Sequence, residues 1–183
     1  IAMEGGVPIK IRSAFSDAPG TLICDVGRSP DRKLIHSDRV ATGVAHLMNI
    51  AQIRVDSSHN VNESGAVSRV FRALADVGIS VDLINVLPEA ICFTVSEDAV
   101  EKAIRTLSGL ELQGAELKTT MGCAKVSVVG AGMRGVPGVM ARVVEALADA
   151  GVQIYQTSDS HASISCLVKK EDAQKAMRGL HSR

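Results

Sequence analysis

The stretch RALADVGISVDLI at residues 72–84 returns 73 positions later as EALADAGVQIYQT at residues 145–157. The same offset continues on both sides without a gap, and it aligns the apolar residues Ala51, Ile53, Val55, Val67, Val70, Phe71 and Leu74 with Ala124, Val126, Val128, Met140, Val143, Val144 and Leu147. Repetition at a fixed spacing indicates that one structural unit is used twice. The sequence therefore predicts two copies of a small domain, preceded by a leader of about 40 residues.

Apolar spacing within each copy predicts the secondary structure, because a period of two is typical of strands and a period of 3.6 is typical of helices. For the first copy the expected elements are a strand at 50–56, a helix from Val67 to Gly78, strands at 79–83 and 91–95, a helix at 100–107 and a strand at 112–119. In the second copy we expect consecutive strands at 152–158 and 163–168. The order βαββαβ predicts an α+β fold of two ferredoxin-like domains, each an antiparallel sheet with both helices on one face.

The last strand of the second copy would fall beyond Arg183, the final residue. The segment 39–46 precedes the first copy and is not used by it, so this segment is a candidate for the missing strand. On this interpretation the first domain (47–120) is inserted into the second domain (39–46 with 121–183). Residues 1–38 form a leader with two short strands around a turn. The alternative is that the chain simply stops before the last strand.

Composition narrows the function classes. The chain has 183 residues, 46% hydrophobic content and a net charge of zero. These values favour a globular, cytoplasmic protein. A net charge of zero gives no overall electrostatic attraction to nucleic acid or to an anionic membrane. No apolar run approaches the roughly 20 residues that a membrane span needs. The four cysteines, Cys24, Cys92, Cys123 and Cys166, are far apart, so we expect reduced core residues rather than a metal site or a disulfide.

Residues with catalytic chemistry form no constellation, and the sequence predicts neither a catalytic residue nor a metal ligand. Gly130, Gly132 and Gly135 satisfy the pattern G-x-G-x-x-G. A dinucleotide site needs parallel βαβ units, however, and here two strands are expected in direct succession after the helix. An RNA-binding sheet of this topology would need exposed aromatic residues, but the chain has no Trp, one Tyr and three Phe. Nucleotide binding is therefore the weaker alternative.

Gly65 and Gly138 correspond under the offset, and each is expected at the start of a helix, beside Ser64 or Pro137. The first N–H groups of a helix have no partner within it, and the helix dipole favours anions there. Such a start can bind a small carboxylate. The alternative is an ordinary tight turn from loop to helix.

Several strings together resemble the C-terminal regulatory region of aspartokinase, whose repeats are ACT domains. They are IKIRSAFSDAPGTLI (9–23), TGVAH (42–46), FRALADVGISVDLINV (71–86), KVSVVGAGMRGVPGV (125–139) and GVQIYQTSDSHASISCLVK (151–169). The resemblance covers essentially the entire chain. Within the family, the chain is most similar to the diaminopimelate-sensitive branch. It implies that residues 1–38 hold the tail of a kinase domain and a connector, and that both copies are ACT domains.

The resemblance implies an allosteric region that binds an end-product amino acid, namely lysine, threonine or diaminopimelate, and so inhibits the ATP-dependent phosphorylation of aspartate. ATP and Mg²⁺ would belong to the kinase domain, so no cofactor is expected in this chain. The expected partners are that kinase domain or α subunit and a second copy of the chain, paired through ACT domains. The alternative is a stand-alone ACT module that binds amino acids without a kinase partner.

In the family the effector lies between ACT domains of paired chains. Carried over by position, the first-copy wall of that site would be Asn62, Ser64, Gly65, Ala66 and Asn85, and the second-copy wall would be Gly138, Met140, Gln153 and Ile154. Many relatives have Asp followed by Pro-Gly in the first loop, where this chain has Asn62 and Ser64-Gly65.

Overall fold

The computed structural model describes residues 7–23, 41–57, 65–110, 112, 114–130, 133 and 136–182. The chain divides into two units, residues 1–39 and 40–183. In the first unit, β1 (Ile9–Ile11) and β2 (Thr21–Ile23) pair antiparallel, which confirms the two short strands expected in the leader. Gly20 allows the turn between them, since its φ of 74° is unfavourable for other residues.

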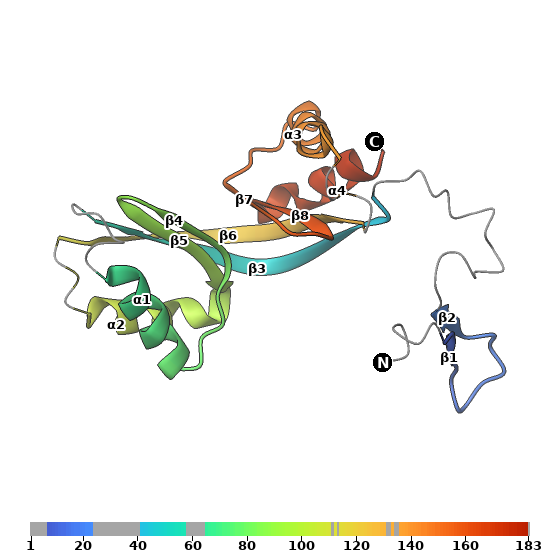
Figure 1. The fold of residues 1–183 in the computed structure, drawn as a ribbon, viewed down its shortest axis with the longest axis horizontal. Coiled ribbons are helices and arrows are strands. Elements are labelled where there is room, and N and C mark those ends of the chain that lie inside the picture. The colour runs from blue at the N-terminus through green and yellow to red at the C-terminus, as the bar shows by residue number, and fades with distance from the viewer. Residues whose placement is uncertain are drawn as a thin grey trace. The chain divides into compact units, whose positions relative to one another are not determined.

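The second unit is an α+β fold built on one six-stranded sheet (Figure 1), as the periodicity predicts in class. In chain order its elements are β3 (Gly43–Asp56), α1 (Ala66–Asp76), β4 (Asp82–Leu87), β5 (Ala90–Ser96), α2 (Val100–Ser108), β6 (Glu116–Val129), α3 (Val139–Asp149), β7 (Gln156–Asp159), β8 (Ser163–Lys169) and α4 (Ala173–His181). The strand order is β4-β5-β3-β6-β8-β7 and every pairing is antiparallel. The parallel βαβ unit that a dinucleotide site needs is therefore not formed by these strands.

Two long strands, β3 and β6, run through both repeats and pair from Gly43 opposite Val129 to Asp56 opposite Glu116, with register shifts between Leu47 and Gln52. Segments 39–46 and 50–56 were expected as separate strands, but the described part of the first joins the second in β3. The pairing of Gly43–Leu47 with β6 is what the insertion hypothesis requires of this segment. The domain boundaries themselves stay a prediction, because they cut through continuous strands.

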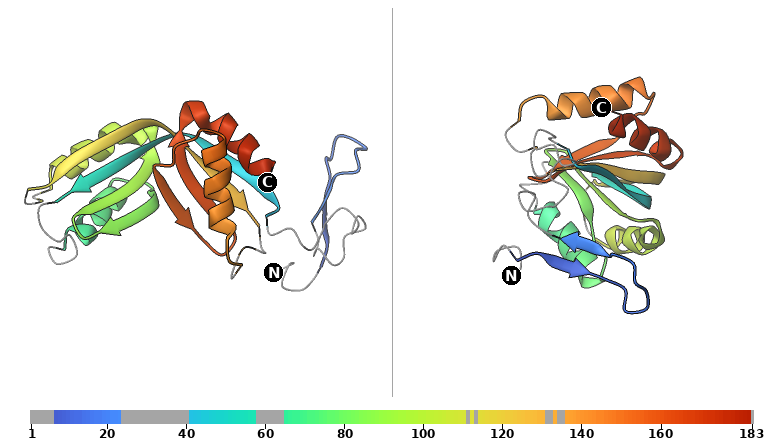
Figure 2. Two further views of the ribbon diagram at one scale, coloured as in Figure 1. Left: turned by 90° about the horizontal axis from the view of Figure 1, so that it is seen from above. Right: turned by 90° about the vertical axis from the view of Figure 1, so that its right-hand side faces the viewer.

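We call the two halves of this unit the first lobe (α1, α2, β4 and β5) and the second lobe (α3, α4, β7 and β8), each with its half of β3 and β6. The two helix pairs lie on opposite faces of the shared sheet, as Figure 1 and the right panel of Figure 2 show. The residues of β3 explain this arrangement, because Ile53 packs into the first core and Val44 packs against the second. Successive strand residues face opposite sides, so odd and even positions serve different lobes.

The sequence predicts strands at 79–83 and 152–158, but both predicted starts are wrong. In the structure β4 begins at Asp82 and β7 begins at Gln156. Ile79 and Val152 are buried, and their burial produced the alternating pattern. Their N–H groups, however, donate to Leu74 and Leu147 and so close the preceding helices. A backbone donor used in a helix C-cap is not available to a strand ladder, so the ladders begin later.

Candidate functional site

Gly65 and Gly138 each stand at the N-cap of a helix, α1 and α3, in the left-handed conformation. Their φ values are 66° and 87°, and a glycine at the N-cap supplies no capping side chain of its own. The first hydrogen bonds within the helices are those from Arg69 to Gly65 and from Arg142 to Gly138. The predicted pair of glycine-started helices is thus present in both lobes. Because glycine has no side chain, a small carboxylate can approach a helix start of this kind closely.

The other residues of the expected first wall lie near the same end of the first lobe. Ala66 is the first residue of α1 and is buried in the first core, and Asn85 is half-buried on β4. Asn85 is paired with Cys92 of β5, so both side chains share the sheet face that the helices leave uncovered. Asn62 and Ser64 lie outside the described residues.

The residues of the expected second wall belong to the second lobe. Met140 is partly exposed on α3, while Gln153 and Ile154 lie in the segment before β7. Gly65 and Gly138 follow opposite ends of the β3–β6 ladder, since β3 ends at Asp56 and β6 ends at Val129. One chain therefore keeps its two glycine helix starts apart, and a site made of both helix starts needs two chains.

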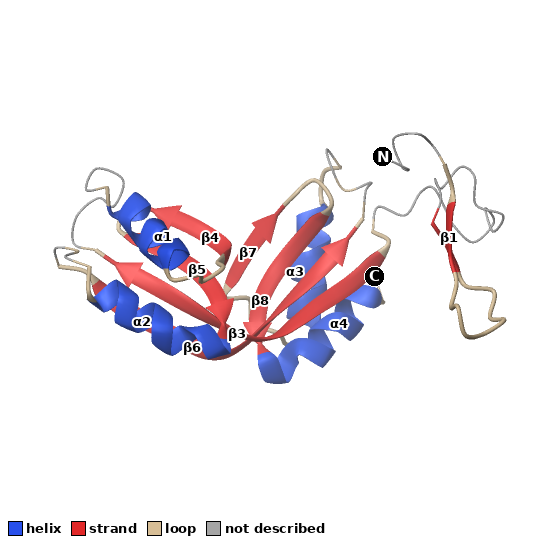
Figure 3. Cartoon of the chain, turned by 90° about the horizontal axis from the view of Figure 1, so that it is seen from below, coloured by secondary structure: helices blue, strands red, loops and turns tan. Residues whose placement is uncertain are grey.

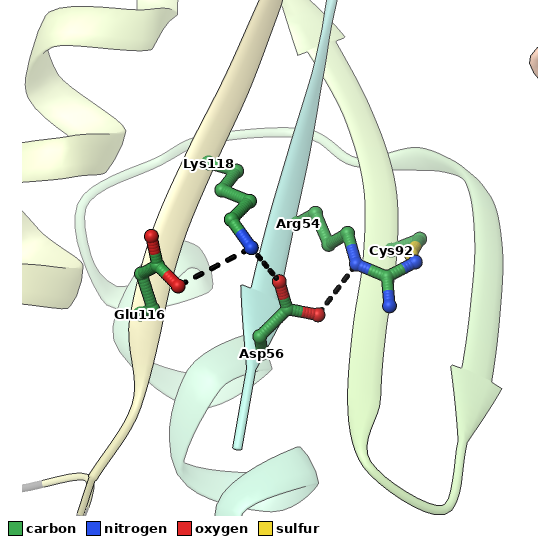
Figure 4. A network of polar contacts seen from close by, with 5 residues as sticks. All are labelled: Arg54, Asp56, Cys92, Glu116 and Lys118. Atoms are coloured by element: carbon green, nitrogen blue, oxygen red, sulfur yellow. Dashed lines mark hydrogen bonds and ion pairs between the residues drawn. The ribbon is translucent and has the colours of Figure 1, made fainter. Parts of the chain in front are cut away.

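The uncovered face of the first lobe carries a charged network that spans β3 and β6 (Figure 4). Arg54 Nε donates to Asp56 Oδ1 at 2.5 Å, and Lys118 Nζ lies 2.8 Å from Asp56 Oδ2 and 3.2 Å from Glu116 Oε2. Arg54 also contacts the sulfur of Cys92 at 3.7 Å. The alternation in β3 places these polar residues opposite the core, but it does not predict their partners on β6 and β5.

Ionic hydrogen bonds hold this network in its charged form. The hydrogen bond from Lys118, helped by that from Arg54, lowers the pKa of Asp56 below its ordinary 3.8, and the pKa of Lys118 is raised in return. Burial raises the pKa of the Cys92, Cys123 and Cys166 thiols, to about 11 for Cys166. All three are free and buried, which confirms the expectation of reduced core cysteines for them. Cys24 lies outside the described residues. Thiols held protonated are poor nucleophiles.

The lowered pKa of Asp56 predicts acid sensitivity. A carboxylate whose pKa falls on folding stabilises the native state above its unfolded pKa, and this stabilisation is lost as the pH falls through its folded pKa. Urea unfolding should therefore show a smaller loss of stability between pH 7 and about pH 3 in Lys118→Met than in the unchanged protein. Lys102→Met is the control, because Lys102 donates to the Val77 carbonyl. Equal acid losses in both variants would contradict this assignment.

Among the described residues no group of three His, Cys, Asp or Glu side chains is placed to hold a metal ion. None of the helices in the described ranges is both long and apolar enough to cross a membrane.

Comparison with known proteins assigns the class first. Two family models match the chain, at residues 53–109 and 118–182, and both are described as an ACT domain. The fold is thus that of a tandem ACT-domain protein, in which one match falls in each lobe.

More specific relatives then assign the family. Aspartokinase 1 of Bacillus subtilis (strain 168) is 39% identical over 99% of this chain, which spans 43% of that relative's length. The ligand-free regulatory subunit of aspartate kinase from Thermus thermophilus is 33% identical, with a TM-score of 0.71 over 79% of this chain and 98% of that one. The corresponding subunit from Thermus flavus is 32% identical, with a TM-score of 0.70 and the same coverage. The chain belongs to the aspartokinase family and corresponds to its regulatory, ACT-domain part rather than to its kinase domain.

Proposed function

We propose that this chain senses an end-product amino acid, lysine, threonine or diaminopimelate, and transmits feedback inhibition to an aspartate kinase. The observation that carries the proposal is the pair of helices that begin after a left-handed glycine at equivalent positions of the two ACT lobes. An α-amino acid carries a carboxylate that such a helix start attracts. Its ammonium needs acceptors, and the Asn85 side chain on β4 supplies one close to the end of the lobe where α1 begins.

The effector would lie between two chains. The first wall, at Gly65, Ala66 and Asn85, would face the second wall, at Gly138, Met140, Gln153 and Ile154, of a second copy. Asn62 and Ser64 would complete the first wall. An effector held in this way contributes contacts only to the paired state, and it therefore shifts the equilibrium toward that state.

Catalysis would belong to a kinase domain or α subunit, which would hold ATP, Mg²⁺ and aspartate, so that this chain needs no cofactor of its own. A solved structure of aspartokinase α and β subunits is 31% identical and has a TM-score of 0.72 over 97% of that chain. The chain alone should form no aspartyl phosphate from ATP and aspartate, and a coupled ADP-release assay checks this. Turnover by the pure chain would contradict the regulatory assignment.

A thermal-shift screen with L-lysine, L-threonine, L-methionine and meso-diaminopimelate tests the proposed sensing function. We expect one of them to raise the melting temperature, with no shift from the D-enantiomer of a chiral hit. The same amino acid should inhibit an aspartate kinase reconstituted with this chain. A thermal shift without inhibition would favour the stand-alone ACT module, and no shift from any of the four would overturn the proposed effector class.

The exposed edge of β4 predicts a homodimer. Ile84, Val86 and Leu87 are 45%, 40% and 44% exposed on this strand, which pairs only with β5 in the sheet order. The edge of β4 away from β5 forms no ladder in the described sheet, although its Leu83 carbonyl accepts from Gln156 of β7. An apolar edge without a ladder partner favours pairing with another chain, and a second copy would meet it around a two-fold axis. Ile84→Lys should convert the dimer to a monomer in light scattering at tens of micromolar, whereas Val129→Lys, at the far end of β6, should not. A monomeric unchanged protein would contradict the prediction.

A further inference from the structure

The two lobes are joined by two backbone crossings, in β3 and in β6, which Figure 3 shows running from one half into the other. Each crossing contains one residue in the left-handed region, Asn49 with φ 59° and Gly122 with φ 67°. These two residues are equivalent positions of the repeat, because they are 73 residues apart. The register of the β3–β6 ladder shifts between Leu47 and Ile50. A left-handed residue within a strand bends it and interrupts its ladder.

Around these bends the sheet curls until its two outer strands touch. β4 and β7 are the first and last strands of the order, yet they contact each other. A separate apolar cluster fills the curl, and it consists of Ile50, Leu83, Cys123 and Leu167 with Tyr155 packed against it. Because Ile50 and Leu83 come from the first lobe and Cys123 and Leu167 from the second, this cluster belongs to the contact between the lobes.

Polar contacts across the lobes surround the apolar cluster. Gln156 is 5% exposed, and its amide donates to the Leu83 carbonyl while its oxygen accepts from Gln52 at 2.7 Å. Lys125 forms an ion pair with Asp82, and this pair lowers the pKa of Asp82 despite the opposing effect of burial. Near the two bends, Lys170 donates to Asn49 at 2.7 Å and the Gly122 N–H donates to Glu97 at 2.9 Å.

The repeat relates these contacts in pairs. Asn49 and Glu97 correspond to Gly122 and Lys170, so the two bends are tied by equivalent contacts with donor and acceptor exchanged. The Asp82–Lys125 ion pair has no equivalent in the repeat. The positions that correspond to Asp82 and Lys125 are Tyr155 and Gln52, which carry no charge to form a second ion pair. The ion pair therefore exists on one side of the approximate two-fold axis alone. Such a one-sided contact favours one relative orientation of two otherwise equivalent halves.

We propose that this region, the interlobe joint, sets the angle between the two lobes, with Asn49 and Gly122 as its pivots and with Gln156 and the Asp82–Lys125 pair as the contacts that select one angle. Bending at two single residues moves each lobe as a rigid body, because the separate cores of the lobes stay intact. Removing a selecting contact frees the angle and leaves both cores folded. The proposal concerns the fold and holds whether or not the chain binds an amino acid.

Distance measurements between the lobes test this proposal. Spin labels on a genetically encoded keto amino acid at Arg72 and Glu145, which are exposed and equivalent positions on α1 and α3, avoid the native cysteines. Double electron–electron resonance on labelled chains diluted with an excess of unlabelled chain, so that only distances within one chain are measured, should give one narrow distance distribution for the otherwise unchanged chain. Lys125→Met and Gln156→Leu should each broaden or shift it. Lys118→Met is the matched control, because Lys118 lies on the same strand and pairs with Asp56 inside the first lobe.

Two further variants address the pivots and keep the test decisive. Gly122→Val should shift the distance, since a β-branched residue is unfavourable at φ 67°, whereas Gly122→Asn should keep it, since Asn tolerates this conformation. Circular dichroism confirms folding of each variant, and Lys125→Met covers the case in which Gln156→Leu does not fold. An unchanged distribution in a folded Lys125→Met variant, or an equal change in Lys118→Met, overturns the proposal.

Discussion

Replacing Phe93 by alanine should destabilise the folded chain by about 3–5 kcal/mol, the range for removing a large aromatic side chain from a packed core. Phe93 is completely buried at the centre of the first core. Its ring meets that of Phe71 edge to face, with centroids 5.6 Å apart. The variant loses both the burial and this contact, because the surrounding strand and helices cannot collapse fully into the space.

The repeat supplies the control for this prediction. Cys166 is the equivalent residue of the second lobe and is also completely buried. Cys166→Ala removes a single heavy atom and should cost about 1 kcal/mol. Urea unfolding followed by circular dichroism measures both differences. Equal effects of the two substitutions would show that the first core is less tightly packed than the structure indicates.

The second large effect concerns the effector response. A ligand at about 100 times its dissociation constant stabilises the native state by roughly 2.7 kcal/mol. Asn85→Ala should abolish this stabilisation by the amino acid found in the screen, because it removes an acceptor for the effector's ammonium. The unliganded melting temperature should stay nearly unchanged, since Asn85 is only half-buried. Differential scanning fluorimetry with and without the amino acid measures both quantities.

Two further variants separate binding from folding. Gly65→Val should lower the unliganded stability by about 1–2 kcal/mol, since it forces a β-branched residue into a left-handed backbone. Apart from the two adjacent residues, no atom of the described residues lies within 4 Å of the added Cβ, so the expected cost is that of the backbone conformation. Gln153→Ala tests the second wall. If Asn85→Ala keeps the full response and Gln153→Ala loses it, the first-wall assignment is wrong.

Helices were predictable from the sequence because their pattern is local. Val70 and Leu74 repeat at helical spacing beside a glycine stop, and α1 forms there. The predicted first residues of two strands were wrong, because an alternating pattern indicates which side chains are buried, whereas backbone hydrogen bonds define a strand. At Ile79 these differ, since its side chain is buried but its N–H closes a helix.

The candidate site was predictable only in part. The glycine pair at 65 and 138 follows from the repeat, and both residues adopt the expected helix-start conformation. The interlobe joint did not follow from the sequence, because contacts such as Gln156 with Leu83 depend on how the whole sheet curls. One signal was present, since Asn49 and Gly122 are polar or flexible residues at equivalent places within apolar strands.

The shared strands β3 and β6 also determine the order in which the lobes assemble. The second lobe needs Gly43 beside Val129, and the entire first lobe lies between them in the chain. Closing so long a loop carries an entropic cost when the intervening chain is unfolded. A folded first lobe already holds β3 and β6 together, so most of the loss of chain entropy has occurred before the second lobe forms. Synthesis from the N-terminus completes the first lobe first. A destabilising substitution in the first core therefore slows the folding of both lobes, whereas one in the second core slows the folding of the second lobe alone.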